Sequence, residues 1–360
     1  MTMNYSPTIV SLFCGCGGAD LGALGGFEYL GSAYPATGAK VIHASDIDAK
    51  AIHTYNKNFE HKAIVEDVRN LSLRGLSADV VIGGFPCQPF STVNPTKQPE
   101  KKESQLFWEM ARIIDEVKPK AFIAENVKGF YRLRQGYYFN LACEKFRSQG
   151  YKISHKLINS SDFGVPQKRE RIFIIGVRED LNHTFEFPDE THGSGDGLIP
   201  KSILSDVIDS LWPQDPKYFF SKRAVDGVKR AKPNMKRALA QDLNSQCLTI
   251  TSHLAKVSLN SRDPVLLVDQ EKELYRRFSP REAARIQSFP DEFQLTGSQG
   301  DAYRQIGNAI PPIVMWHLAT ALFNQLNNPS DRTLNYPKEF QFEQQTLFEK
   351  SVKDDRLVSL

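Results

Sequence analysis

Short apolar runs recur along the first half of the chain, and turns or segments of helical periodicity separate them. The strands that this pattern predicts are residues 8–13, 40–45, 63–68, 80–82, 121–124 and 172–177. Residues 105–117 instead space their apolar side chains as an amphipathic helix does, and Pro119 follows directly. Strands that alternate with helices in this way predict an α/β fold built on a doubly wound, Rossmann-like sheet.

The first predicted strand runs into a glycine-rich turn and then a helix. Gly15, Gly17 and Gly18 let the backbone approach a ligand where a Cβ atom would collide, although their spacing departs from the dinucleotide fingerprint. Asp46 ends the second strand, where an acid is expected to accept hydrogen bonds from ribose hydroxyls. Asp48 is better placed to cap the helix that begins at residue 49.

Cys87 follows a buried strand on a stiffened loop. Gly83 and Gly84 end the strand, and Pro86 and Pro89 restrict the chain on either side of the thiol. A free cysteine is commonly a buried packing residue. A thiol on a rigid loop at a strand end is instead placed as a nucleophile, and we favour that interpretation.

Acids follow two further strands of the predicted sheet. Asp67 ends the third strand and Glu125 ends the strand at 121–124. Since ligands of open α/β sheets bind at the carboxyl ends of the strands, we expect Asp46, Asp67, Cys87 and Glu125 to converge on one site. Asp67 could alternatively be a turn residue.

Composition limits the classes of protein that remain. With 360 residues, 41% of them hydrophobic, the chain suits one large α/β unit plus a smaller one. We find no apolar run of membrane-spanning length and no secretory signal, and five irregularly spaced cysteines suit a reducing cytoplasm. Cys14 and Cys16 lack a second cluster with zinc spacing, so we expect no metal.

Positive charge is concentrated in one segment. Residues 217–237 hold eight basic side chains and one acid, a net charge of +7 against +3 for the whole chain. Such a run is either a solvated surface or a phosphate-binding face.

Several motifs together resemble those of the cytosine-C5 DNA methyltransferases of bacterial restriction-modification systems. They are Gly-Phe-Pro-Cys-Gln-Pro-Phe-Ser at 84–91, Glu-Asn-Val at 125–127, Gln-Lys-Arg-Glu-Arg at 167–171, and the stretches 277–290 and 303–311. The resemblance covers residues 9–178 and 276–322. The chain departs from it at Cys14, where Ser or Ala is usual, and at Ser288, where Gly is usual.

This resemblance implies a reaction and roles for four residues. Cys87 would add to C6 of a flipped-out cytosine, Glu125 would act over N3 and the exocyclic amine, and Arg171 would donate to O2. Arg169 lies on the same face of the extended chain and would brace Glu125 or the catalytic loop. The methyl donor would be S-adenosylmethionine, with S-adenosylhomocysteine as product, and an ordered water would take the C5 proton.

The resemblance also implies two sets of contacts. The residues expected to bind S-adenosylmethionine are Phe13, Gly15, Cys16, Gly17, Gly18, Asp46, Ile47, Asp67, Val68, Gly84, Pro86, Leu106, Asn308 and Ala309. Those expected to contact DNA are Ser91, Lys222, Arg223, Lys229, Arg230, Lys232, Thr249 and Thr251.

The implied organisation is a catalytic and cofactor-binding domain, a target-recognition domain and a tail. These are residues 1–178 plus 276–328, residues 179–275 and residues 329–360, with a DNA cleft between the two domains. The second domain would supply Thr249 and Thr251, and a helix capped by Ser279, with Pro280 at its first position, would support it.

The expected partner is double-stranded DNA. We expect the protein to be a cytoplasmic, nucleoid-associated monomer that could pair functionally with a restriction endonuclease. Two alternatives remain open. The tRNA-acting branch of the family usually carries Pro-Pro-Cys-Gln, so Phe85 favours DNA. A catalytically silent DNA-binding relative is disfavoured because Cys87, Glu125 and Arg171 are all intact.

Overall fold

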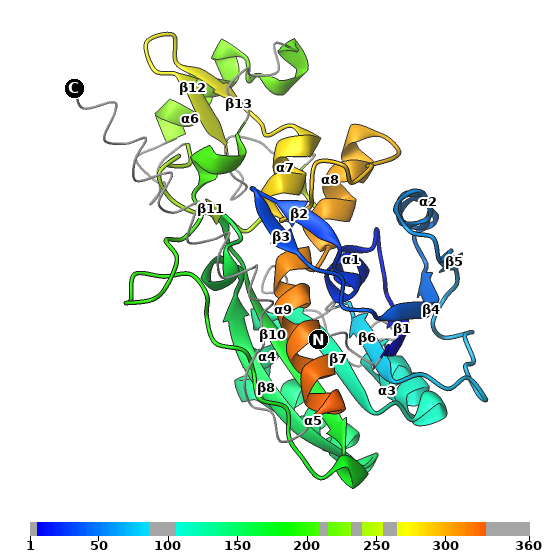
Figure 1. Cartoon of the computed structure of the whole chain (residues 1–360). Coiled ribbons are helices and arrows are strands. Elements are labelled where there is room, and N and C mark those ends of the chain that lie inside the picture. Colours follow the sequence, from blue (N-terminus) through cyan, green and yellow to red (C-terminus); the bar gives the residue numbers. More distant parts are fainter. Residues whose placement is uncertain (1–5, 87–105, 209–214, 232–239, 255–264, 329–360) are drawn as a thin grey trace.

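A seven-stranded mixed sheet forms the centre of the computed structural model, which describes residues 6–86, 106–208, 215–231, 240–254 and 265–328 (Figure 1). Its strands are β1 (Thr8–Leu12), β4 (Lys40–Asp46), β5 (Ile64–Val65), β6 (Val80–Gly84), β7 (Ala121–Val127), β8 (Tyr151–Asn159) and β10 (Glu170–Arg178). They lie in the order β5-β4-β1-β6-β7-β10-β8. The mixed α/β fold predicted from the apolar pattern is confirmed.

The direction of the strands fixes where a ligand can bind. The five strands from β5 to β7 are parallel, whereas β10 runs antiparallel to both β7 and β8. The chain leaves β1 toward β4 on one side and returns to β6 on the other, so the strand order reverses at β1. Such a switch point opens a crevice at the carboxyl ends of the strands.

Helices cover both faces of the sheet, and the alternation of strand side chains decides which residues each face buries. The helices are α1 (Gly18–Leu24), α2 (Ala49–Asn58), α3 (Leu106–Val117), α4 (Lys128–Arg132), α5 (Tyr137–Ser148), α6 (Lys222–Ala231), α7 (Pro280–Ile286), α8 (Gln299–Asn308) and α9 (Pro312–Asn327). Ile9 and Ile123 belong to the core beneath α1 and α9, whereas Val10 and Phe122 belong to the core beneath α3 and α5.

Local sequence signals account for several element boundaries. Asp48 caps α2 by accepting from the amides of Lys50 and Ala51, as predicted. Ser279 caps α7 in a reciprocal arrangement with Glu282, and Pro280 occupies the first position, also as predicted. The predicted strand 63–68 shortens to β5 because the chain turns beyond it, with the Asn70 amide donating to the Asp67 carbonyl.

One helical stretch, Gln299–Asn327, is long and apolar enough by composition to cross a membrane, but 89% of its apolar window is buried inside the protein. It comprises α8 and α9. Trp316 of α9 is fully buried and donates its indole N–H to the carbonyl of Pro35 at 2.9 Å. Packing in the core therefore accounts for the apolar composition of this stretch.

Short elements complete the described parts of the chain. The remaining strands are β2 (Phe27–Tyr29), β3 (Ser32–Tyr34), β9 (Gln167–Lys168), β11 (Cys247–Leu248), β12 (Leu266–Asp269) and β13 (Leu274–Arg276). The 3-10 helices are η2 (Leu133–Gly136), η3 (Ser160–Phe163), η4 (Glu179–Leu181), η5 (Leu204–Val207) and η6 (Pro216–Tyr218). Figure 1 shows β12, β13 and α6 together, away from the main sheet. The division into two domains and a tail stays a prediction.

Candidate active site

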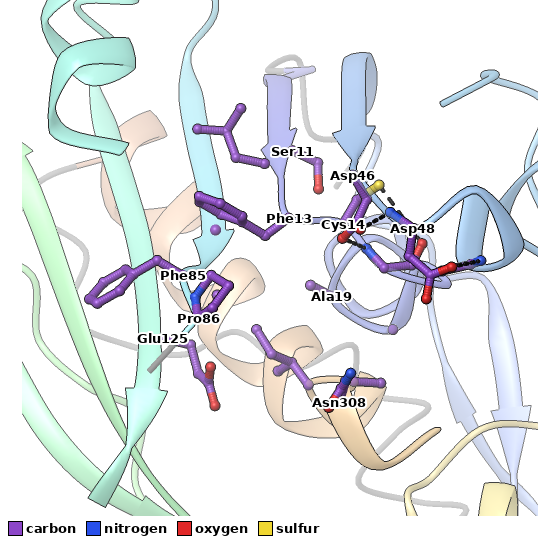
Figure 2. Close-up of a pocket in the computed structure, with 18 of the residues that line it drawn as sticks. Ser11, Phe13, Cys14, Ala19, Asp46, Asp48, Phe85, Pro86, Glu125 and Asn308 are labelled. Atoms are coloured by element: carbon purple, nitrogen blue, oxygen red, sulfur yellow. Dashed lines mark hydrogen bonds between the residues drawn. The ribbon is translucent and has the colours of Figure 1, made fainter. Parts of the chain in front are cut away.

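A pocket of about 570 Å³ opens at the carboxyl ends of the central strands. Its lining includes the following residues predicted to bind the cofactor: Phe13, Gly15, Cys16, Gly18, Asp46, Ile47, Asp67, Val68, Gly84, Pro86, Leu106, Asn308 and Ala309. Glu125, Arg169 and Arg171 line it as well. Figure 2 shows Asp46 and Asp48 on one side of the pocket and Glu125 beside Pro86 on another. The expected convergence of these strand ends is therefore present in the described residues.

The glycine-rich turn and Asp46 form one wall together. The Gly15 amide donates to Asp46 Oδ2 at 2.9 Å, and the Asp48 amide donates to Asp46 Oδ1 at 2.8 Å. A Cβ atom on Gly15 would meet no protein atom within 4 Å, so that face of the turn is open to the pocket. Burial raises the pKa of the Asp46 carboxyl. Each of its oxygens keeps a lone pair for a hydroxyl donor.

Gly17 is the exception among the predicted cofactor residues that the structure describes. It lies outside the pocket lining, at φ +97°, and a Cβ atom there would lie 2.3 Å from the Phe59 ring. The glycine is therefore needed for packing of α2 against the turn, and its contact with the cofactor stays a prediction.

Asp67 lies at the edge of the pocket in a turn. Its Oδ1 accepts from the Arg69 amide at 3.0 Å, and Arg69 Nε donates to both carboxylate oxygens at 2.9 and 3.0 Å. Hydrogen bonding by Arg69 holds the pKa of the Asp67 carboxyl below its ordinary value. An amino group that approached Asp67 would share this carboxylate with Arg69.

Glu125 is buried next to the strand that precedes Cys87. Gly84 pairs with Glu125 across β6 and β7, and a Cβ atom on Gly84 would lie 3.1 Å from Glu125 Oε2. The absent side chain makes room for this carboxyl group. Next to it, buried Asn126 donates its side-chain amide to the Phe85 carbonyl at 3.0 Å. The loop that leads to Cys87 is thus fixed to the strand that carries Glu125.

Two arginines of the Gln-Lys-Arg-Glu-Arg stretch have different surroundings. Arg171 Nε lies 3.0 Å from Glu125 Oε1, in a pair whose side chains are 15% and 11% exposed. Burial raises the pKa of Glu125, and the positive charges of Arg171 and Arg169 oppose that rise. Arg169 is 2% exposed and donates to backbone carbonyls of Ile250, Gly307 and Ala309. Arg171, not Arg169, is therefore the residue that directly contacts Glu125.

Three predicted site residues lie outside the described residues: Cys87, Ser91 and Lys232. Cys87 comes directly after Pro86, the last described residue before that gap, and Pro86 lines the pocket.

The basic segment is partly engaged within the protein. Lys229 forms an ion pair with Glu273, and Arg230 Nε donates to the Asp226 carbonyl at 3.3 Å. Lys222 and Arg223 are exposed at the start of α6, without an ion pair to another described residue. These two are therefore the better candidates for phosphate contact.

The predicted Thr249 and Thr251 lie beside β9 and not in the pocket. Thr249 Oγ1 donates to the Lys168 carbonyl at 2.7 Å, and Thr251 Oγ1 accepts from the His253 amide at 3.2 Å. Their contact with DNA stays a prediction.

Some lining residues were not identified from the sequence. They include Ser11, Glu66, Arg69, Phe85, Asn126, Gln305, Gly307 and Ile310. Asn126 could have been identified, because it adjoins Glu125 in the motif and lies at the carboxyl end of the same strand. Arg69 carries no comparable signal, since it reaches the pocket through a turn.

Taken together, the mixed sheet, the glycine-rich turn and the buried carboxyl–guanidinium pair define an α/β protein of the enzyme class, with its candidate site at the strand ends. The model of the C-5 cytosine-specific DNA methylase family matches residues 7–324, and the chain belongs to this family. The chain is a DNA cytosine-C5 methyltransferase by that membership.

Similar proteins agree with this membership. The Type II methyltransferase M.BspRI of Lysinibacillus sphaericus is 33% identical over 84% of this chain and 78% of its own length. M.BsuRI of Bacillus subtilis is 32% identical over 88% and 79%. Among solved structures, a prophage-encoded protein of E. coli assigned as a DNA modification methyltransferase aligns with a TM-score of 0.64 at 25% identity, covering 90% of this chain and all of that one.

Proposed function

We propose that the protein transfers a methyl group from S-adenosylmethionine to C5 of a flipped-out cytosine in a specific double-stranded DNA sequence, through a covalent bond between Cys87 and C6. The observation that carries the proposal is the pairing of buried Glu125 with Arg171 at 3.0 Å, beside the strand that leads to Cys87. That pair shares one pocket with the glycine-rich turn and Asp46.

The residues of the pocket fit S-adenosylmethionine. Asp46 retains acceptor capacity for ribose hydroxyls, the open face of Gly15 leaves space against the backbone, and Ile47, Val68 and Leu106 supply apolar surface. When bound, S-adenosylmethionine supplies a methyl group made electrophilic by a positively charged sulfur. Five carboxyl groups line the pocket against three arginines, and this excess favours a cation; the residues are Asp46, Asp48, Glu66, Asp67 and Glu125, and Arg69, Arg169 and Arg171.

The chemistry assigned to the protein's own residues follows from what cytosine lacks. C5 is a poor nucleophile until the Cys87 thiolate adds to C6, which gives the ring enamine character. The negative charge that develops toward N3 and O2 needs a proton donor and a hydrogen-bond donor. Glu125, whose pKa burial raises, would give a proton to N3, and Arg171 would hold both Glu125 and O2.

The cycle must then restore Cys87. After C5 gains the methyl group, loss of the C5 proton forms the C5–C6 double bond again and expels the Cys87 sulfur. No described side chain is assigned as the base, and we assign this step to a water molecule.

Bisulfite sequencing of a plasmid from cells that express the protein tests the function and identifies the target sequence. Protected cytosines at one recurrent sequence are expected, and none are expected with Cys87→Ser. A duplex with 5-fluorocytosine at the target should form an adduct that survives denaturation, because fluorine cannot leave as a proton does. An adduct formed by Cys87→Ser, or none formed by the wild-type protein, would contradict the assignment of the nucleophile.

A further inference from the structure

Three buried polar side chains meet where the predicted recognition segment touches the pocket. Gln167 and Gln287 are fully buried and Arg169 is 2% exposed. Burying such groups costs stability unless each donor and acceptor finds a partner. Their partners belong to three segments that lie far apart in the sequence.

The first set of contacts holds residues 247–251. β11 pairs in parallel with β9, so Cys247 and Leu248 lie beside Gln167 and Lys168. Gln167 Oε1 accepts from the Ile250 amide at 2.8 Å, and Arg169 Nη1 donates to the Ile250 carbonyl at 3.0 Å. Both backbone groups of Ile250 are therefore held by these two side chains.

The second set of contacts holds the wall of the pocket after α8. Arg169 Nη2 donates to the carbonyls of Gly307 at 3.2 Å and Ala309 at 3.1 Å. Gln287 Nε2 donates to the same Ala309 carbonyl at 2.5 Å. Gln167 Nε2 donates to Gln287 Oε1 at 2.6 Å, which joins the two sets of contacts.

The two segments also touch through their backbones. A Cβ atom on Gly307 would lie 2.2 Å from the Thr251 carbonyl carbon and 2.4 Å from the Ser252 amide nitrogen. Gly307 lines the pocket, whereas residues 247–252 are outside its lining. A shift of the pocket wall at Gly307 therefore transmits directly to Thr251.

The energetics favour movement of residues 247–251 and the wall at Gly307–Ala309 as one unit. Separating the two segments would leave buried donors and carbonyls without partners, which lowers stability for each group and most for a charged one. Three side chains share these bonds, so a displacement of one segment draws the others with it.

We propose that Gln167, Arg169 and Gln287 are positioning residues that couple binding of the methyl donor to engagement of DNA by the segment 247–251. This inference rests on the proposed function. A ligand that orders the Gly307–Ala309 wall also orders Ile250 and its neighbours. Linkage requires the reverse as well, so DNA held by that segment must tighten donor binding by the same factor.

The test is calorimetric titration of S-adenosylhomocysteine with and without a duplex carrying the sequence that bisulfite sequencing identifies. In the wild-type protein we expect the duplex to tighten binding about tenfold, within the usual range of coupling between sites. Gln287→Met keeps the volume but removes the hydrogen bonds, and Gly307→Ala forces the two backbones apart. Both should reduce the ratio of dissociation constants to below about twofold.

The matched control is Gly195→Ala, where the added Cβ atom would make an ordinary contact at 3.5 Å with Leu198 Cδ1. It should retain the wild-type ratio. Variants that fold and keep the full ratio would overturn the inference, as would a wild-type ratio of one. Failure of the proposed function is a different result, in which the wild-type protein binds neither ligand and protects no cytosine.

Hydrogen exchange on the wild-type protein gives a second reading that needs no variant. S-adenosylhomocysteine alone should slow exchange of the Ile250 amide, which lies outside the pocket and is bonded to Gln167 Oε1. Protection confined to peptides that line the pocket would overturn the coupling.

Discussion

Replacing Asp20 by Asn should stabilise the protein at neutral pH and leave it unchanged in acid. Asp20 lies in the first turn of α1 and is 1% exposed. Its Oδ2 accepts from Ser11 Oγ at 2.9 Å, and the hydroxyls of Ser11 and Tyr55 only partly oppose the effect of burial on the pKa of this carboxyl. Burial raises the pKa of this carboxyl from its ordinary 3.8 to about 6.

The magnitude and its sign follow from that pKa. Because the folded state holds the proton to higher pH than the unfolded state, the folded state loses stability as the pH rises from 3.8 through 6. At 1.36 kcal/mol for each pKa unit, the loss is about 3 kcal/mol and is complete above pH 7. Asn cannot ionise, and it keeps an oxygen for Ser11 Oγ.

Urea unfolding of both proteins from pH 4.5 to 7.5 measures the effect. The free energy of unfolding of the Asn variant minus that of the wild type should increase by about 2 kcal/mol across this range, because the part of the loss between pH 3.8 and 4.5 lies below it. Other titrating groups cancel in the difference, including the buried histidines His192 and His317, whose pKa values burial lowers. Gly195→Ala, which changes no titratable group, is the control with a flat difference. A flat difference for Asp20→Asn as well would refute the reasoning.

Three further predictions concern the reaction and DNA. Arg171→Met removes a positive charge that opposes the rise in the pKa of Glu125. The alkaline limb of the pH profile of kcat/KM should therefore move to higher pH, while kcat falls roughly 100-fold. An alkaline limb at the wild-type pH would contradict the role of the pair. The double variant Lys222→Ala/Arg223→Ala should flatten the slope of the logarithm of the DNA-binding constant against log salt by up to about 1.8. Lys229→Ala should leave this slope unchanged, because the Lys229 ammonium pairs with Glu273. Equal slopes for the wild type and the double variant would show that α6 is a solvated surface without phosphate contacts. Finally, a target cytosine in a mismatch costs less to extrude and should bind more tightly than a paired one in a fluorescence titration, and equal affinities would remove extrusion from the recognition energy.

The sequence predicted the parts of the site that depend on strand ends and short-range signals. Asp46 and Glu125 could be placed because a buried strand delivers its next residue to the carboxyl edge of the sheet. Asp48 could be placed as a cap because only the residues directly after it are involved. Ser288 could also be identified as unusual, and it adopts φ +65°, a conformation that favours the glycine usual in the family.

The remaining contacts depend on segments that pack together without a periodic signal. Gln167 and Gln287 are 120 residues apart, and nothing in the sequence around either residue indicates that their side chains form a hydrogen bond. Charge alone likewise failed to separate Lys229, which is paired within the protein, from Lys222, because the ion pair depends on where Glu273 lies in the fold.

The order of the chain has a consequence for synthesis on the ribosome. The pocket joins the turn at Gly15 to Asn308, and a Cβ atom on Gly18 would lie 2.5 Å from the Ile310 carbonyl oxygen. At about 5–20 residues per second, the ribosome makes the first strand some 15 to 60 s before α8. A nascent protein that lacks α8 therefore has an incomplete pocket, and methylation of DNA must wait until translation has almost reached the end of the family domain at residue 324.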